Sequence, residues 1–226
     1  KAHDLFGRTM MGVPYEQMKY QPMGDLWLDF PGHEDVQSYR RELDLDRAVA
    51  TTSYIVDGVT FTRDVFSSAV DQVIVIRLSA DQPGALTFAA KLHGIRNPAH
   101  SNYGTDYFEM DGLSPNQLRL TGKSSDYLGI EGQMRYEARL EATAEGGTMS
   151  IDYRTLKVEG ADAVTMILAG ATNFVNYRDV SADPSDRVDD ALIAVRTRSL
   201  SDITQDHVEE HQAWFRRVEI AIPGDP

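Results

Sequence analysis

Apolar residues at every second position run through much of this 226-residue chain and limit the folds that it can adopt. Leu26, Leu28 and Phe30 have this spacing, and it returns over residues 59–65. Successive side chains of a β-strand point to opposite faces, so a period of two predicts strands with one buried face. Residues 72–79 are apolar almost throughout, which is typical of a strand buried on both faces. The pattern therefore favours a mainly-β core.

Short turn signals separate these segments. The pairs that can supply the positive φ angles of tight hairpins are Asp57-Gly58, Asp111-Gly112 and Gly146-Gly147. Residues 81–84 indicate another turn, and 94–116 is predicted to be a loop with one short strand at most. Later strands are predicted at 85–92, 117–122, 133–144, 148–158 and 163–171. About ten strands joined by short turns predict an antiparallel β-sandwich or supersandwich rather than a parallel α/β sheet.

The pattern becomes helical after residue 180. Asp183 and Pro184 can cap and begin a helix, and Val188, Ala191, Leu192 and Val195 then share one of its faces. A second helix is predicted over about 202–217, with a common face formed by His207, His211, Trp214, Phe215 and Val218. We therefore predict a sandwich over 1–180, a helical segment over 181–217, and the start of a further domain or a tail over 218–226.

Composition excludes several classes of function. The formal net charge is −13, whereas proteins that bind nucleic acid need clustered lysine and arginine. The chain has no cysteine, which excludes disulfides and zinc sites built on thiolates. No apolar run approaches the roughly 18–20 residues of a membrane-spanning helix. We expect no nucleic-acid or membrane partner and no cofactor.

The second predicted helix carries a metal-like motif. His207, Glu210 and His211 match the H-x-x-E-H pattern of inverted zinc proteases, with both histidines on one helix face. Zinc would need a further ligand, and only fifteen residues follow His211. The alternative is that both histidines pack beside Trp214 and Phe215 on a buried face. We favour packing and predict no metal site, which leaves a metal-dependent peptidase as the weakest functional hypothesis.

Acidic residues are frequent enough to form the carboxylate pairs that glycoside hydrolysis uses. The candidates are Glu34/Asp35, Asp44/Asp46, Glu131, Glu137 and Asp189/Asp190. Asp44 and Asp46 are predicted to share the solvated face of one strand, whereas neighbours such as Asp189 and Asp190 point to different sides of a helix. Such pairs are expected in an acidic protein, so we predict no catalytic residue in this chain.

Aromatic rings can stack on pyranose faces, and side-chain amides can bridge sugar hydroxyls. The candidates for sugar contact are Trp27, Tyr103, Tyr107, Phe108, Tyr127, Asn173 and Tyr177. Tyr103 and Tyr107 lie in the predicted loop, where exposed rings are often functional. Trp27 lies on the strand face opposite Leu26 and Leu28. Packing in the core or against a neighbouring domain is the alternative for each residue, and the one that we favour.

Several segments resemble one known family. The first three are YQPMGDLWLDFPGH from Tyr20, YRRELDLDRAVATTSYIVDGVTFTRDVFSS from Tyr39 and DQVIVIRLSAD from Asp71. EGQMRYEARLEATAEGG at 131–147 and GADAVTMILAGATNFVNYRDVSADP at 160–184 extend the match to most of the chain. Together they resemble the N-terminal β-sandwich domain of glycoside hydrolase family 95, the α-L-fucosidase family.

The resemblance implies a non-catalytic domain, because the catalytic carboxylate of that family lies in a following (α/α)6 helical barrel. It implies that the sandwich over 1–180 lacks its first strands and that 181–217 is the helical linker to a barrel that the sandwich supports. It also implies that this chain is a fragment without the barrel. The parent enzyme would hydrolyse terminal α-L-fucosides of fucosylated oligosaccharides with inversion, or L-galactosides as neighbouring members do. We expect a secreted or periplasmic location rather than a cytoplasmic one. A stand-alone carbohydrate-binding module is the alternative function.

Overall fold

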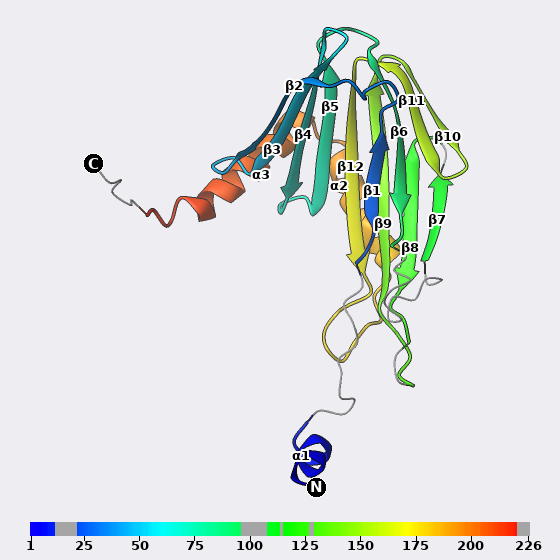
Figure 1. The fold of residues 1–226 in the computed structure, drawn as a ribbon, viewed down its shortest axis with the longest axis vertical. Helices are drawn as coiled ribbons and strands as arrows, with labels where there is room; N and C mark the ends of the chain where they lie inside the picture. The colour runs from blue at the N-terminus through cyan, green and yellow to red at the C-terminus, as the bar shows by residue number, and fades with distance from the viewer. Residues whose placement is uncertain (12–21, 96–107, 114, 127–128, 221–226) are drawn as a thin grey trace.

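The computed structural model describes residues 1–11, 22–95, 108–113, 115–126 and 129–220. In this part of the chain twelve strands form two antiparallel sheets (Figure 1). The smaller sheet has the order β1 (Asp25–Asp29), β6 (Leu86–His93), β11 (Thr155–Ala161) and β10 (Thr148–Asp152). The larger sheet has the order β2 (Gln37–Asp44), β3 (Val49–Val56), β4 (Val59–Ser68), β5 (Val73–Ala80), β12 (Ala163–Thr172), β9 (Arg135–Glu145), β8 (Gln117–Lys123) and β7 (Phe108–Leu113). The predicted antiparallel, mainly-β fold class is confirmed.

An apolar core lies between the two sheets. Leu140 and Met166 of the larger sheet and Leu156 and Val158 of the smaller sheet are completely buried in it. Burying a side chain of this size is worth roughly 1.5–3 kcal/mol, so these facing rows hold the sheets together. The smaller sheet contacts β7, β8 and β9, whereas β2, β3 and β4 extend away from it (Figure 1).

Two helices pack on the opposite face of the larger sheet, α2 (Pro184–Arg196) and α3 (Leu200–Phe215). Val188, Leu192 and Val195 of α2 are buried there, as their spacing predicted. The Asp183 carboxylate accepts a 2.9 Å hydrogen bond from the backbone N–H of Ser185, so the predicted cap is confirmed. A shorter helix, α1 (Ala2–Thr9), precedes the strands and buries none of its residues. None of the helices in the described ranges is long and apolar enough to cross a membrane.

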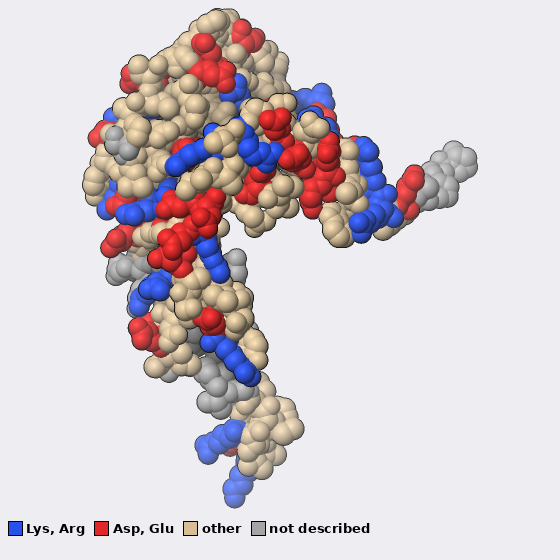
Figure 2. All heavy atoms as spheres, turned by 180° about the vertical axis from the view of Figure 1, so that it is seen from behind, with Lys and Arg blue, Asp and Glu red and all other residues tan. Residues whose placement is uncertain are grey.

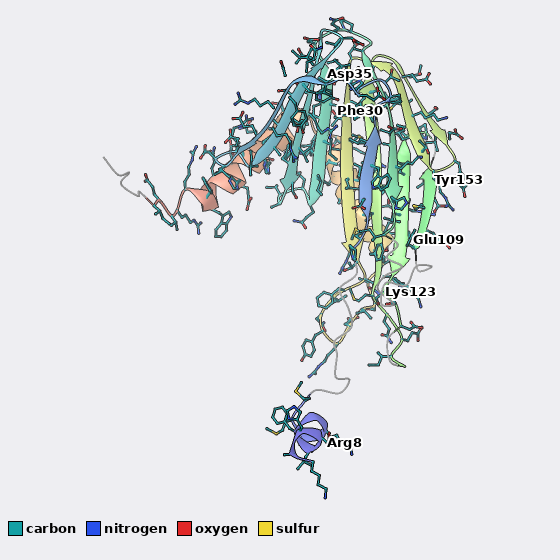
Figure 3. All side chains as sticks on the ribbon, in the orientation of Figure 1. Arg8, Phe30, Asp35, Glu109, Lys123 and Tyr153 are labelled. Carbon is teal, nitrogen blue, oxygen red and sulfur yellow. The ribbon has the colours of Figure 1, made fainter. Side chains whose placement is uncertain are left out.

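Most predicted turns are confirmed. Asp57-Gly58 joins β3 to β4 and Gly146-Gly147 joins β9 to β10, all with positive φ, and residues 81–84 join β5 to β6. The segment 148–158 was expected to form one strand, and this is wrong, because it belongs to the β10–β11 hairpin. Tyr153, labelled in Figure 3, lies at the turn with a φ of 56°. A tyrosine rarely takes this conformation, so no turn signal marks the position in the sequence.

Asp111-Gly112 does not form the predicted turn. Both residues lie inside β7, within the segment 94–116, and pair with β8. A Cβ atom at Gly112 would lie 2.2 Å from the carbonyl oxygen of Tyr153 and 2.4 Å from Cγ2 of Ile151. Glycine therefore lets the β10–β11 hairpin of the smaller sheet lie directly against β7. The sequence alone does not distinguish such a close approach from a turn.

Candidate functional site

A buried ionic network fastens α2 to the larger sheet. Arg139 on β9 forms ion pairs with Glu137 on the same strand and with Asp189 on α2. The Glu137 side chain is almost completely buried, and its other carboxylate oxygen accepts a hydrogen bond from the Ser185 hydroxyl. A buried carboxylate needs such partners, because removing an isolated charge from water is costly. Charge as well as apolar contact therefore fixes α2 on the sheet.

Helix α3 lies on the β2–β3 turn at the edge of the larger sheet. Nε2 of His207 lies 3.1 Å from the carbonyl oxygen of Arg47, and Nε2 of His211 lies 2.8 Å from that of Leu45. The His207 ring also stacks on Phe66, with 4.6 Å between the ring centroids. A carbonyl oxygen can only accept a hydrogen bond, so each Nε2 carries the donated proton. Both histidines thus attach the helix to the turn.

These contacts account for the H-x-x-E-H pattern without a metal. A histidine nitrogen that donates its proton to a carbonyl cannot bind a metal ion through that atom, which leaves only Nδ1 of each ring as a possible ligand. Glu210 lies on the same helix, between His207 and His211 in the sequence. Within the described ranges, no group of three or more histidine, aspartate or glutamate side chains is placed to hold a metal ion. We therefore assign His207 and His211 a structural role.

Asp46 joins the same turn to the last part of α3. Its carboxylate accepts hydrogen bonds of 2.6 and 2.7 Å from Arg216 and one of 2.9 Å from the Gln212 side chain. The hydrogen bonds from Arg216 lower the pKa of the Asp46 carboxyl. Asp44 ends β2, and its carboxylate accepts hydrogen bonds from the backbone N–H groups of Asp46 and Arg47. The prediction that Asp44 and Asp46 share a strand face is wrong, because the two residues shape a turn.

The apolar face of α3 continues past the edge of the sheet. The exposed fraction rises along this face from 4% at His207 to 45% at Phe215 and 61% at Trp214. Figure 1 shows the carboxyl end of α3 projecting beyond β2 and β3. The expectation that Trp214 and Phe215 are buried is therefore wrong. The helix rises about 1.5 Å per residue, so its apolar face extends past the edge of the sheet, which covers only the first half of the helix.

We use the name α3 end for the exposed apolar side chains of the β2–β3 turn, of the last turn of α3 and of the residues that follow it, Leu45, Trp214, Phe215, Val218 and Ile220. The Arg217 guanidinium lies 4.0 Å from the centre of a Trp214 ring. Figure 2 shows this helix as a projecting arm on which acidic and basic side chains border uncharged surface. Several large apolar side chains exposed at one end of an element, with charged neighbours, are typical of surfaces that contact another protein or domain.

The structure does not bring the candidates for sugar contact together. Trp27 lies on the outer face of the smaller sheet, whereas Asn173 and Tyr177 lie in the connection between β12 and α2. Phe108 begins β7. The candidates that lie outside the described residues are Tyr103, Tyr107 and Tyr127.

Asn173 holds three backbone groups in place. Its amide oxygen accepts a 2.8 Å hydrogen bond from the N–H of Arg135, and its amide nitrogen donates to the carbonyls of Gln133 at 2.9 Å and Val180 at 2.8 Å. Both amide protons are engaged, so we assign this buried residue a structural role. Tyr177 is exposed, with the Arg178 guanidinium 4.9 Å from its ring centroid, and sugar contact there stays a prediction.

Two of the candidate carboxylates have a role in the scaffold. Glu137 and Asp189 meet at the guanidinium of Arg139, which occupies oxygens that a hydrolytic pair would direct at a sugar. This network was not among the predictions from the sequence, although the sequence contains a signal for it. Glu137, Arg139 and Glu141 occupy alternate positions of β9, so their charges share the face on which α2 packs. Arg196 of α2 pairs with Glu141 at 2.7 Å on that face.

Two facing antiparallel sheets with a helical appendage place the chain in the class of β-sandwich domains. The family described as "Glycosyl hydrolase family 65, N-terminal domain" matches residues 1–177. The chain belongs to this family and is an N-terminal sandwich domain related to glycoside hydrolases. The match does not confirm family 95, which the sequence segments resembled.

Curated relatives are fucosidases by name. The chain is 32% identical over 224 residues to "Alpha-L-fucosidase 2" of Arabidopsis thaliana, a match that covers 91% of this chain and 26% of the relative. It is 27% identical over 222 residues to "Probable alpha-fucosidase A" of Aspergillus niger, a match that covers 92% of this chain and 26% of the relative. The chain thus spans about a quarter of the length of these relatives. A solved structure, "Putative kojibiose phosphorylase from human microbiome", is similar in fold with a TM-score of 0.54 and 11% identity, over 80% of this chain and 25% of that chain.

Proposed function

We propose that this chain is the non-catalytic N-terminal β-domain of an α-L-fucosidase-like glycoside hydrolase of family 95. In the parent enzyme the sandwich supports a catalytic (α/α)6 barrel, which hydrolyses terminal α-L-fucosides of oligosaccharides with inversion outside the cytoplasm. The names of the two curated relatives support the substrate class. Their length supports a larger parent, because the chain covers only 26% of each.

The observation that carries this proposal is the α3 end. The first half of the apolar face of α3 is covered by the domain's own sheet, and the second half projects beyond it. The eight residue steps from His207 to Phe215 correspond to roughly 12 Å of helix. Burying a large apolar side chain is worth roughly 1.5–3 kcal/mol, so covering Trp214 and Phe215 would strongly favour docking. The barrel that follows the linker is the occupant that we propose.

The test is to replace the two aromatic residues in two contexts. Trp214→Ser with Phe215→Ser should lower the melting temperature of the parent enzyme and expose the linker to limited proteolysis. The same changes should affect the 226-residue chain much less, because both side chains are already largely accessible to solvent in it. Ile193→Ser is the matched control, since Ile193 is 57% exposed on α2 and lies outside the α3 end.

Two results would contradict the proposed docking surface. If the double substitution destabilises the isolated chain as much as the parent, the aromatic residues pack within the domain itself. If the parent is insensitive to the double substitution, the barrel docks elsewhere or is absent. The substrate class has a separate test, in which the parent enzyme is compared on 4-nitrophenyl α-L-fucoside and 4-nitrophenyl α-L-galactoside. We expect the fucoside to be the better substrate.

A further inference from the structure

Trp27 occupies an unusual position for so large an apolar side chain. It lies in the middle of β1, which is an edge strand of the smaller sheet. Its neighbours Leu26 and Leu28 pack against the sandwich core, so the indole points to the outer face, where it is 58% exposed. The indole therefore lies outside the core, and its exposed face is accessible to a ligand.

The neighbouring strand β6 holds the indole in a fixed orientation. Trp27 is paired with Lys91 in the antiparallel register, which places His93 and Ala89 diagonally on either side of it. The indole stacks on the His93 ring, with 5.0 Å between centroids and 14° between planes. The diagonal neighbour on the other side is an alanine, too small to cover the second indole face. One face of a positioned aromatic ring is therefore open.

Polar groups without partners surround this ring. Asp25 and Asp29 lie two residues before and after Trp27 on the same exposed face of β1, and Lys91 lies opposite it. All three side chains are exposed, and in the described part of the chain none of them enters an ion pair or a side-chain hydrogen bond. Carboxylates accept hydrogen bonds and an ammonium group donates them. The open ring is thus bordered by both kinds of hydrogen-bonding group.

This combination matches the chemistry of a pyranose. A sugar ring has an apolar C–H face that can stack on an aromatic ring, and its hydroxyl groups both donate and accept hydrogen bonds. A protein partner fits less well, since a stable interface buries about 800 Å² per partner and one tryptophan supplies at most about 250 Å². The two carboxylates beside the indole disfavour phosphates and other anions.

We propose that Trp27, with Asp25, Asp29 and Lys91, forms an ancillary site for one pyranose ring of a neutral oligosaccharide. The site goes beyond the proposed support of a barrel, because it would hold sugar on the sandwich itself and has no part in hydrolysis. A single stacked ring supports only weak binding, with a Kd on the order of 1 mM.

The test uses the 226-residue chain, whose only tryptophans are Trp27 and Trp214. In a Trp214→Phe background the fluorescence reports on Trp27 alone. The probes are 2′-fucosyllactose, maltotriose and cellotriose, titrated to concentrations well above the expected Kd. At least one probe should shift the Trp27 emission in a saturable manner and should bind in an independent calorimetric titration.

Substitutions locate the site. Trp27→Ala should weaken binding at least tenfold, whereas Trp27→Tyr, which keeps an aromatic face, should stay within about threefold of the starting chain. Tyr153→Ala is the matched control, because Tyr153 is a 75% exposed aromatic residue at the β10–β11 turn of the same sheet. If Trp27→Ala does not fold, Lys91→Ala should still weaken binding.

Two results would overturn the proposal. One is the absence of saturable binding of all three probes. The other is binding that is equally strong with Trp27→Ala, or that is lost with Tyr153→Ala instead. Neither result bears on the docking of α3 or on hydrolysis, so this proposal and the proposed function can fail separately.

Discussion

Replacing Arg139 by methionine should strongly destabilise the domain, because it leaves the Glu137 carboxylate buried without its cation. The Glu137 side chain is 1% exposed and that of Arg139 is 11% exposed, so water can replace little of the lost interaction. Removing one partner of a buried pair costs about 3–5 kcal/mol. In a domain of this size 1 kcal/mol corresponds to roughly 2–4 °C, so the melting temperature should fall by roughly 6–20 °C.

The assay is thermal and urea denaturation of the 226-residue chain, with two comparison variants. Arg196→Met removes an ion pair whose arginine is 44% exposed, and it should cost only about 0–1 kcal/mol. Glu137→Leu combined with Arg139→Met removes both charges, so the double variant should recover part of the stability that Arg139→Met loses. The reasoning is refuted if Arg139→Met costs no more than Arg196→Met, or if the double variant is less stable than Arg139→Met alone.

Three further predictions concern single positions. Leu192→Ala should cost about 2–5 kcal/mol in urea denaturation, since Leu192 is 1% exposed between α2 and the sheet, and a loss below 1 kcal/mol would contradict that packing. Gly112→Ala should lower the melting temperature, because the new Cβ would lie 2.2 Å from the carbonyl oxygen of Tyr153, and an unchanged value would show that the hairpin can move aside. The pKa of Asp46 is lowered by Arg216, so this contact should stabilise the fold above the ordinary carboxyl pKa of about 4 and be lost as the pH falls through the lowered value. A carboxyl ¹³C NMR titration of Asp46 should give a pKa below the ordinary value, and an ordinary pKa there, or one unchanged in Arg216→Ala, would contradict the pairing.

Local patterns predicted much of this fold. The two-residue period placed most strands, because every strand of a sandwich turns one face to the core. Asp183 and Pro184 marked the start of α2, because capping depends on residues that adjoin in the sequence. Tyr153 and Gly112 were misread for different reasons. Tyr153 lies at a hairpin turn with a positive φ but is not a typical turn residue. Gly112 resembles a turn residue but permits a close approach of the β10–β11 hairpin, and a local pattern carries no information about that contact.

The candidate site was less predictable from the sequence. The face of α3 that carries His207, His211 and Phe215 was identified correctly, although the helix ends at Phe215 and does not include Val218. The edge of the sheet beneath that face is formed by β2, which is distant in the sequence, so its position was not predictable. Trp214 was therefore assigned to the common face of the predicted helix and is nevertheless exposed. Asn173 was a candidate for sugar contact because a side-chain amide can hydrogen-bond to two hydroxyl groups. The same donors and acceptor bind three backbone groups here.

We propose above that this chain is a supporting domain of a larger fucosidase-like enzyme. The most direct test is to measure hydrolysis of 4-nitrophenyl α-L-fucoside by the purified 226-residue chain and, at equal molar concentration, by the full-length polypeptide from its native source. We predict turnover by the full-length polypeptide and none by the chain. Comparable turnover by the chain alone, or a full-length polypeptide that is inactive on the fucoside, would contradict the account.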